Sequence, residues 1–282
     1  MSPDDPAAST PVRETLQTGL LTSGEPARLS FLRAGRGHPV ILLHGFASDA
    51  ADDWVGTGWF DSLVTAGYDV CAPDLRGHGR SLKSSEPADY RLDAFAQDVA
   101  ALCGHCWGNA ELALVGYSMG AHVAMAAALA LGNRVKRLVL GGMGDRIAAT
   151  VGLAPEFADA LDARDEARLG AFPSYAVRFR RHAESLPYND LPVLAACLRG
   201  QSARFDLGLL SSFVAPTLVV VGRRDKLAGD PQPVAAAFAS GTGATVPGIG
   251  HVDALADPDF RQCALAFLEG AFAPHTTQEV SA

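Results

Sequence analysis

The sequence lacks an excess of basic residues. Its 282 residues include 23 Lys and Arg against 31 Asp and Glu, and the formal net charge at pH 7 is −8. A nucleic-acid surface needs clustered Lys and Arg to neutralise phosphates. The charge balance therefore argues against nucleic acid as a partner, and it leaves the chemistry of a small-molecule partner open.

Long apolar runs are also missing. No stretch approaches the roughly 18 unbroken apolar residues that a membrane span needs, and the richest run, Met119 to Leu131, is interrupted by His122. The segment Met1 to Pro6 has neither the basic nor the apolar region of a secretory signal. We therefore expect no membrane span, a short disordered lead-in over residues 1–10 and a cytoplasmic location.

The sequence has few cysteines, and their number is odd. Five cysteines without a secretory context indicate reduced thiols. Cys103 and Cys106 form a Cys-Gly-His-Cys group, but a structural zinc needs four ligands, and no second Cys/His pair at ligand spacing follows. We therefore expect a helix end with free thiols at this position and no metal.

The sequence does contain ample apolar material for a core, with 48% hydrophobic and 19% charged residues. Short apolar runs alternate with helical stretches, which is typical of a parallel sheet between helix layers. An antiparallel edge hairpin of residues 12–20 and 28–34 is expected before them. The expected strands are 40–43, 68–72, 112–115, 135–140 and 217–221, and the expected helices are 53–66, 92–102, 119–131, 231–239 and 257–272.

The alternation breaks between Leu140 and Thr217. The stretch of roughly 70 residues is far longer than a strand-to-helix crossover requires. It has helical periodicity and several prolines but no strand run. We therefore expect a small helical cap, inserted late in the sheet, over residues 143–214. An α/β core over 11–142 and 215–275 and a tail over 276–282 complete the expected organisation.

A Gly-x-Ser-x-Gly motif surrounds Ser118. The run Gly116 to Gly120 directly follows an apolar strand and opens an apolar helix, which are the two contexts that a nucleophile elbow requires. The sharp turn exposes the serine hydroxyl beside a helix N-terminus, which favours developing negative charge. Ser118 is therefore the candidate nucleophile.

A serine hydroxyl needs a base to take its proton, and the base needs a carboxylate to orient it. Of the eight histidines, His251 lies in a late loop, where the carboxyl ends of parallel strands gather site residues. Asp225 follows the 217–221 strand, and the order Ser, Asp, His is typical of α/β-hydrolases. Asp145, after the preceding strand, is the rival carboxylate. Asp253 is too near His251 in sequence to reach its Nδ1.

Acyl transfer also needs donors for the oxyanion of its tetrahedral intermediate. The backbone N–H groups of Phe46, after the first parallel strand, and of Met119, after the nucleophile, are expected to supply them. His44 is expected to pack the loop. The expected pocket residues are aromatic: Trp54, Trp59, Tyr117, Phe172 and Phe179.

Several motifs together resemble the α/β-hydrolase superfamily, in its esterase, enol-lactonase and perhydrolase-like branch, over residues 29–272. They are His44-Gly45-Phe46, Asp74–Ser81, Gly116–Gly120, Gly222–Asp225 and Gly250-His251. The resemblance implies a metal-free and cofactor-free hydrolase whose cap shapes the pocket, and a structural Asp74–Ser81 loop that braces the elbow. Related dehalogenases and epoxide hydrolases have Asp at the elbow, so Ser118 argues against alkyl-enzyme chemistry.

These features predict a serine hydrolase that cleaves a small carboxylic ester or lactone through an acyl-enzyme. Hydrolysis of a C–C bond in a diketone-like substrate is an alternative with the same three residues. A ligand-binding receptor on this fold is a second alternative, because fold alone does not determine function. The sequence leaves the oligomeric state open.

Overall fold

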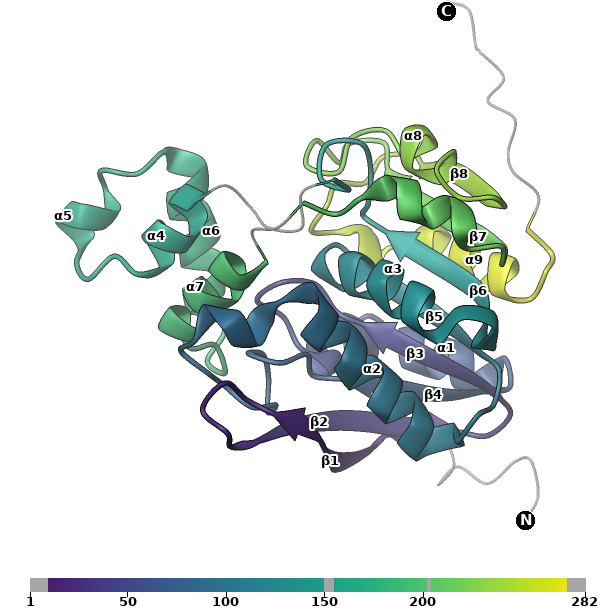
Figure 1. Ribbon diagram of the computed structural model, residues 1–282. Helices are drawn as coiled ribbons and strands as arrows, with labels where there is room; N and C mark the ends of the chain where they lie inside the picture. The colour runs from purple at the N-terminus through teal and green to yellow at the C-terminus, as the bar shows by residue number, and fades with distance from the viewer. Residues whose placement is uncertain (1–9, 150–154, 202–203, 273–282) are drawn as a thin grey trace, which may run out of the picture.

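The computed structural model describes residues 10–149, 155–201 and 204–272. Nearly all of the expected lead-in and the whole of the expected tail lie outside these residues. Within the described ranges, the chain forms an eight-stranded sheet with helices on both faces (Figure 1). This arrangement confirms the predicted fold class.

The strands follow the order β1-β2-β4-β3-β5-β6-β7-β8 across the sheet. The antiparallel hairpin β1–β2 forms one edge, β2 also runs antiparallel to β4, and every pair from β4 to β8 is parallel. The carboxyl ends of β3, β5, β6 and β7 therefore meet along one edge. The strands are β1 (Val12–Leu20), β2 (Pro26–Gly35), β3 (His38–Leu43), β4 (Tyr68–Pro73), β5 (Leu112–Tyr117), β6 (Val135–Gly141), β7 (Thr217–Gly222) and β8 (Gly241–Val246).

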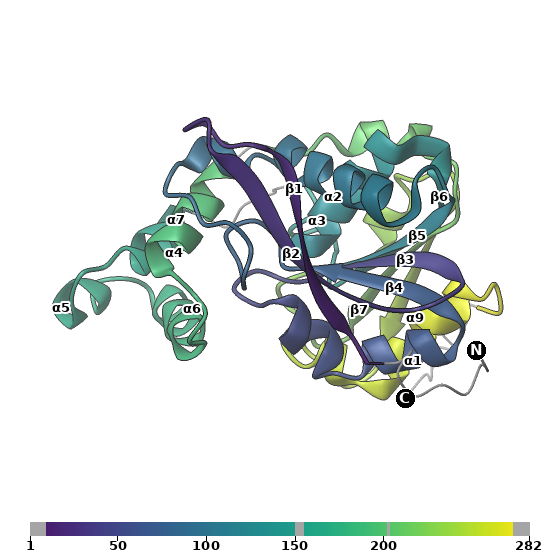
Figure 2. The same ribbon diagram turned by 90° about the horizontal axis from the view of Figure 1, so that it is seen from below.

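Two apolar clusters cover the two faces of the sheet. Helices α2 (Leu92–Trp107), α3 (Met119–Leu131) and α8 (Gln232–Ala235) pack on one face, and α1 (Trp59–Thr65) and α9 (Pro258–Leu268) pack on the other. Figure 2 shows the sheet between these layers. Burial on both faces explains why the central strands are mostly apolar, with Asp69 of β4 and Thr217 of β7 as buried polar exceptions.

The structure corrects the expected helix over residues 53–66. A short π-helical turn over Ala51–Val55 is followed by Gly56, Thr57 and Gly58, and α1 begins only at Trp59. Gly58 has φ +79°, a left-handed conformation that interrupts the helix. The expected helix over 231–239 is likewise shorter, and an eighth strand precedes the His251 loop.

Between β6 and β7 the regular elements of the described residues are helical. The helices over residues 155–200 lie to one side of the sheet, beyond the carboxyl ends of its strands (Figures 1 and 2), whereas the last helical turn before β7 packs on the core beside residues 119–131. Apolar side chains from three of these helices pack around Ala47 of the core and beside Phe46. The helices are α4 (Pro155–Leu161), α5 (Glu166–Leu169), α6 (Ser174–Ser185) and α7 (Leu191–Gly200), followed by a 3-10 helix over Leu207–Ser212.

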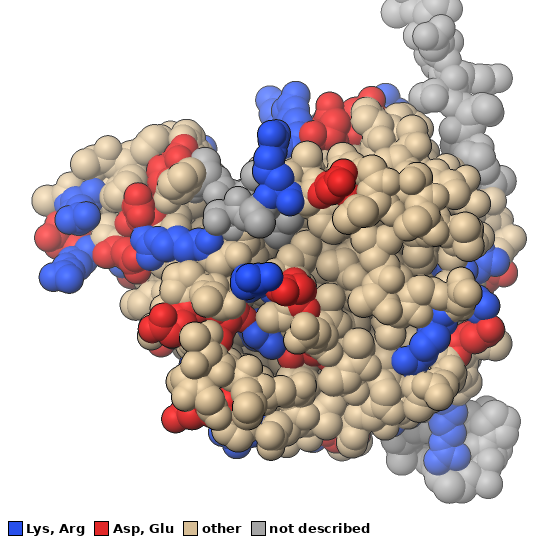
Figure 3. Space-filling model, in the orientation of Figure 1, with Lys and Arg blue, Asp and Glu red and all other residues tan. Residues whose placement is uncertain are grey.

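Several charged side chains of this helical segment form ion pairs at its surface. Arg181 contacts Glu166 and Glu184, and Arg199 contacts Asp159 and Asp162. Figure 3 accordingly shows both signs of charge interspersed over this part of the face. Among the described residues, no helix is both long enough and apolar enough to cross a membrane.

Candidate active site

Ser118 occupies a strained turn between β5 and α3. Its φ of 52° and ψ of −113° are unusual for a residue with a side chain, and such conformations cost on the order of 1–3 kcal/mol. The flanking glycines make the turn possible, because a Cβ on Gly116 would lie 2.2 Å from the Gly120 carbonyl oxygen. A Cβ on Gly120 would lie 2.0 Å from the Leu43 carbonyl oxygen. The start of α3 thereby packs directly against the end of β3.

His251 links Ser118 to Asp225. Its Nε2 lies 2.9 Å from Ser118 Oγ, and its Nδ1 lies 2.7 Å from Asp225 Oδ2. The other carboxylate oxygen of Asp225 accepts the backbone N–H groups of Leu227 and Ala228 at 3.1 and 2.8 Å. Because the carboxylate only accepts, Nδ1 carries the proton and Nε2 is free to accept the serine proton.

The rival carboxylates point elsewhere. Asp145 Oδ1 accepts the backbone N–H of Asp230 at 2.9 Å, and the Asp145 N–H pairs with the Asp230 carbonyl. This carboxylate fixes the turn after β7. Asp253 is exposed at the start of a short 3-10 helix. Of the three carboxylates considered from sequence, the structure brings Asp225 to His251.

Tyr117 lies under the histidine loop. Its ring centroid is 5.3 Å from that of His251, and its hydroxyl donates to the His251 backbone carbonyl. Burial raises the pKa of the Tyr117 phenol, and Asp225 and Asp53 raise it further, so the hydroxyl stays a neutral donor. The side chain therefore orients the loop that carries His251.

The two expected oxyanion donors lie on adjoining segments. Met119 is the first residue of α3, and Phe46 lies in the loop after β3. Within the described ranges, neither N–H donates to a protein acceptor. The Phe46 ring is stacked on Phe179 of α6 at 5.4 Å and contacts the edge of His78 at 5.4 Å.

The loop after β3 is held by buried polar groups. His44 is fully buried, and its Nε2 accepts the Leu75 N–H at 2.8 Å, which leaves Nδ1 to donate to the Gly45 carbonyl at 2.7 Å. Asp53 accepts the Gly45 N–H at 2.8 Å and the Ser48 hydroxyl at 2.5 Å. His44 therefore holds this loop through both of its ring nitrogens.

The Asp74–Ser81 loop braces this same segment. Besides the bond from Leu75 to His44, Asp74 accepts the Ala50 N–H at 3.1 Å. Burial and the nearby His44 lower the pKa of His78 to about 3, so its ring is neutral where it packs on Phe46. The resemblance implies that this loop braces the nucleophile elbow, whereas its hydrogen bonds described here reach the loop after β3.

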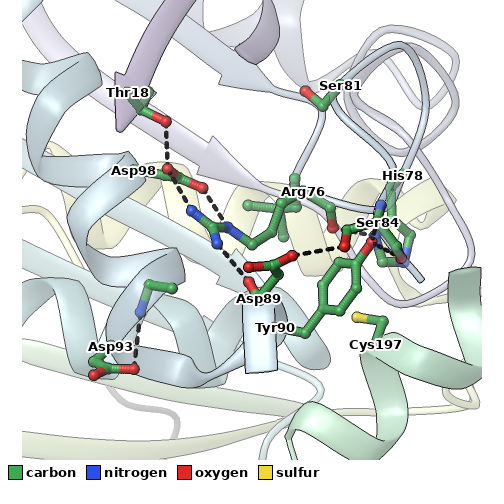
Figure 4. A network of polar contacts seen from close by, with 12 residues as sticks. Thr18, Arg76, His78, Ser81, Ser84, Asp89, Tyr90, Asp93, Asp98 and Cys197 are labelled. Carbon is green, nitrogen blue, oxygen red and sulfur yellow. Dashed lines mark hydrogen bonds and ion pairs between the residues drawn. The ribbon is translucent and has the colours of Figure 1, made fainter. Parts of the chain in front are cut away.

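A buried ion pair anchors the Asp74–Ser81 loop to α2. Arg76 donates to both carboxylate oxygens of Asp98 at 2.7 and 2.8 Å, and it also donates to the Asp89 carbonyl. Thr18 donates to Asp98 from the edge hairpin (Figure 4). The bidentate geometry and near-complete burial fix the loop rigidly beside the site.

The expected pocket residues have different environments. Trp54 and Trp59 are fully buried, 5.4 Å apart in an edge-to-face pair, within the core cluster of α1 and α9. Their assignment to a pocket is therefore wrong, because their rings face the core between the sheet and its helices. Phe172 packs in a small cluster among α4, α5 and α6. Phe179 contacts Phe46, as described above.

Sequence reasoning missed Asp53 and Asn189 near this site. Asp53 was expected to be the first residue of a regular helix, a position that indicates no contact with Gly45 or Ser48. Asn189 donates to the carbonyl of Ala47, a residue 142 positions earlier. Phe157 packs edge-to-face on Phe179 at 4.9 Å. Phe157 belongs to the helical periodicity that the sequence shows in the inserted segment, whereas no motif marked Asn189.

Among the described residues, no group of three or more His, Cys, Asp or Glu side chains is placed to hold a metal ion. Cys103 and Cys106 lie in the last turns of α2. The arrangement of Ser118, His251 and Asp225 is one that activates a serine hydroxyl by proton transfer.

Comparison with known proteins extends these observations. The chain is 35% identical over 191 residues to a non-heme haloperoxidase of Rhodococcus erythropolis, covering 68% of this chain and 58% of that protein. It resembles the structure of a thermophilic esterase from Thermogutta terrifontis, with a TM-score of 0.69 and 25% identity over 94% of this chain and 100% of the other. A structure described as Est816, an N-acyl homoserine lactone degrading enzyme, shares the fold with a TM-score of 0.67 and 24% identity over 89% and 98% of the two chains.

The chain spans less than two thirds of the length of curated relatives that it matches, at 58% of the haloperoxidase and 32% of an uncharacterised Mycobacterium bovis protein. A family model described as alpha/beta hydrolase fold matches residues 38–193, which include the loop after β3 and the nucleophile elbow. The predicted resemblance is thereby confirmed, and the chain belongs to the α/β-hydrolase fold superfamily.

Proposed function

We propose that this protein is a serine hydrolase that cleaves small carboxylic esters or lactones through an acyl-enzyme intermediate. The observation that carries the proposal is the hydrogen-bonded chain from Asp225 through His251 to Ser118 on a strained elbow. The esterase and lactone-degrading structures with the same fold are consistent with this substrate class.

In the first step, Ser118 Oγ attacks the substrate carbonyl carbon while His251 Nε2 takes the hydroxyl proton. The negative charge on the carbonyl oxygen is stabilised by the N–H groups of Phe46 and Met119. His251 then gives its proton to the leaving alkoxide as the C–O bond breaks. In a lactone, the released hydroxyl remains attached to the acyl chain.

In the second step, a water molecule attacks the acyl carbon and gives a proton to His251. The tetrahedral intermediate collapses, the proton returns to Ser118, and a carboxylic acid is released. Asp225 stays ionised throughout and stabilises the imidazolium form of His251. The proposed mechanism needs no metal and no cofactor.

Turnover on a substrate panel tests this proposal. We expect repeated turnovers on small esters or lactones, with a burst of alcohol release if deacylation is slow. The panel should include diketones, and also hydrogen peroxide as the acyl acceptor, because one relative is a haloperoxidase. Preferential cleavage of diketones would favour the C–C hydrolase alternative, and binding without repeated turnover would favour a receptor.

We further propose that the inserted segment over 143–214 acts as a cap that selects the substrate and excludes water. Phe179 places its ring on Phe46, and therefore beside a proposed oxyanion donor, and Phe157 packs edge-to-face on Phe179. An apolar contact at this position favours an apolar acyl chain.

Phe179→Ala is therefore expected to change the preferred acyl chain length, because one apolar contact discriminates by roughly 1–3 kcal/mol per methylene. Phe172→Ala is the matched control, since Phe172 packs among the inserted helices and not on Phe46. The measurement is kcat/KM for a series of linear acyl esters. Equal shifts in both variants would contradict a direct contact between Phe179 and substrate.

A further inference from the structure

The turn between α6 and α7 reaches the loop that follows β3. Asn189 in this turn donates through Nδ2 to the Ala47 carbonyl at 2.9 Å and to the Ala183 carbonyl at 3.0 Å. Both partners are acceptors, so the amide nitrogen must face them. One amide group thus joins the inserted helices to the residue directly after Phe46.

Ala47 has an unusual backbone conformation. Its φ is +61°, in the left-handed region, where a residue with a Cβ loses roughly 1–2 kcal/mol. Its side chain is 1% exposed, against Leu194, Ala195 and Leu198 of α7. A strained conformation of this kind persists only where its surroundings hold it. At Ala47, the apolar contacts shown here come from the inserted helices.

The same loop is held from the core on either side of Phe46. Asp53 accepts from the Gly45 N–H and from the Ser48 hydroxyl. These bonds fix the two ends of the segment, while Asn189 fixes the carbonyl between them. The backbone conformation around the Phe46 N–H is therefore held at all of these points only when the α6–α7 turn is in place.

We propose that Asn189 is a positioning residue for the oxyanion hole: by holding the Ala47 carbonyl it aims the Phe46 N–H at the substrate carbonyl oxygen. The inference rests on the proposed acyl-transfer function. Asn189 does not touch the reacting atoms, and its effect passes through the backbone of Ala47. The inserted segment then completes the catalytic site as well as covering it.

Asn189→Asp tests this role with a side chain of nearly the same shape. The variant removes both N–H donors and sets an oxygen against two carbonyl oxygens. We expect kcat to fall on the order of 10²-fold for short and long acyl esters alike, because a donor displaced by about 1 Å loses its effect in the transition state. KM should change little, and the affinity for a boronic acid that mimics the intermediate should fall by a similar factor.

Tyr188→Phe is the matched control. Tyr188 is the neighbouring residue, and its hydroxyl donates to Asp52 at 2.6 Å, so the variant removes a bond between the same turn and the same core segment. It leaves Ala47 untouched and should keep the wild-type kcat. Asn189→Leu removes the donors without adding charge. Its kcat provides a second test if Asn189→Asp melts at a lower temperature than the wild type.

The outcomes separate the two proposals. An unchanged kcat in both Asn189 variants, or a raised KM that depends on acyl length with kcat preserved, would overturn the positioning role. If the wild-type protein neither turns over nor labels at Ser118, the proposed function fails. Hydrogen exchange of the Gly45 amide then still tests whether Asn189 holds the loop after β3. Faster exchange in Asn189→Asp than in Tyr188→Phe supports that role, and equal exchange in the two variants refutes it.

Discussion

Ser118→Ala is expected to abolish the burst with an activated ester and to lower turnover by about 10⁶-fold, the scale seen when a nucleophile of this kind is removed. The proposed oxyanion donors remain in the variant, so weak catalysis of water attack is expected to remain. Stopped-flow absorbance with a nitrophenyl acyl ester measures the burst, and mass spectrometry after fluorophosphonate treatment locates the label.

The variant should fold normally, because the smaller alanine side chain fits the same turn without losing a buried apolar contact. Ser185→Ala is a suitable control, since Ser185 donates only to the His182 carbonyl on the exposed end of α6. Burst kinetics retained in Ser118→Ala, with the near-ultraviolet circular dichroism of the native protein, would assign the nucleophile elsewhere.

Asp225→Asn is expected to lower turnover by about 10⁴-fold, as loss of the carboxylate does in a comparable triad. The N–H groups of Leu227 and Ala228 require an acceptor oxygen on their side of residue 225. The introduced amide must therefore turn its NH₂ toward His251 Nδ1. That contact favours the tautomer with a proton on Nε2, which is unable to accept the serine proton.

Asp145→Asn is the matched control for this variant. Its amide oxygen continues to accept the Asp230 N–H, so the turn is preserved and turnover should stay near that of the wild type. The comparison uses kcat for one activated ester at one pH. A larger loss in Asp145→Asn than in Asp225→Asn would move the orienting carboxylate to the loop after β6.

The sequence predicted the sheet well because its central strands are buried on both faces. Val40 to Leu43 and Leu218 to Val221 are apolar throughout, and a short, continuous apolar run of this kind favours a buried strand. The elbow was predictable for a related reason, since Gly116 and Gly120 are required by close backbone approach. Both constraints act on residues that are close together in the chain, so each is recognisable as a short sequence pattern.

The features that escaped prediction depend on contacts between distant segments. A sequence pattern does not say that Trp54 and Trp59 turn toward α9, since either direction buries an aromatic ring. The π-helical turn at Asp53 depends on donors that the carboxylate finds at Gly45 and Ser48. Asn189 lies 142 residues from its partner, beyond the range of any local motif.

The place of the inserted helices in the chain has a consequence for biosynthesis. Ser118 and both proposed oxyanion donors precede the insertion, while Asp225 and His251 follow it. As the polypeptide leaves the ribosome, the nucleophile emerges well before its base, and the serine hydroxyl is then no more reactive than that of free serine. Under the proposed mechanism, hydrolysis begins only when β7 and the His251 loop have joined the sheet, so a chain that ends before His251 is expected to lack hydrolase activity.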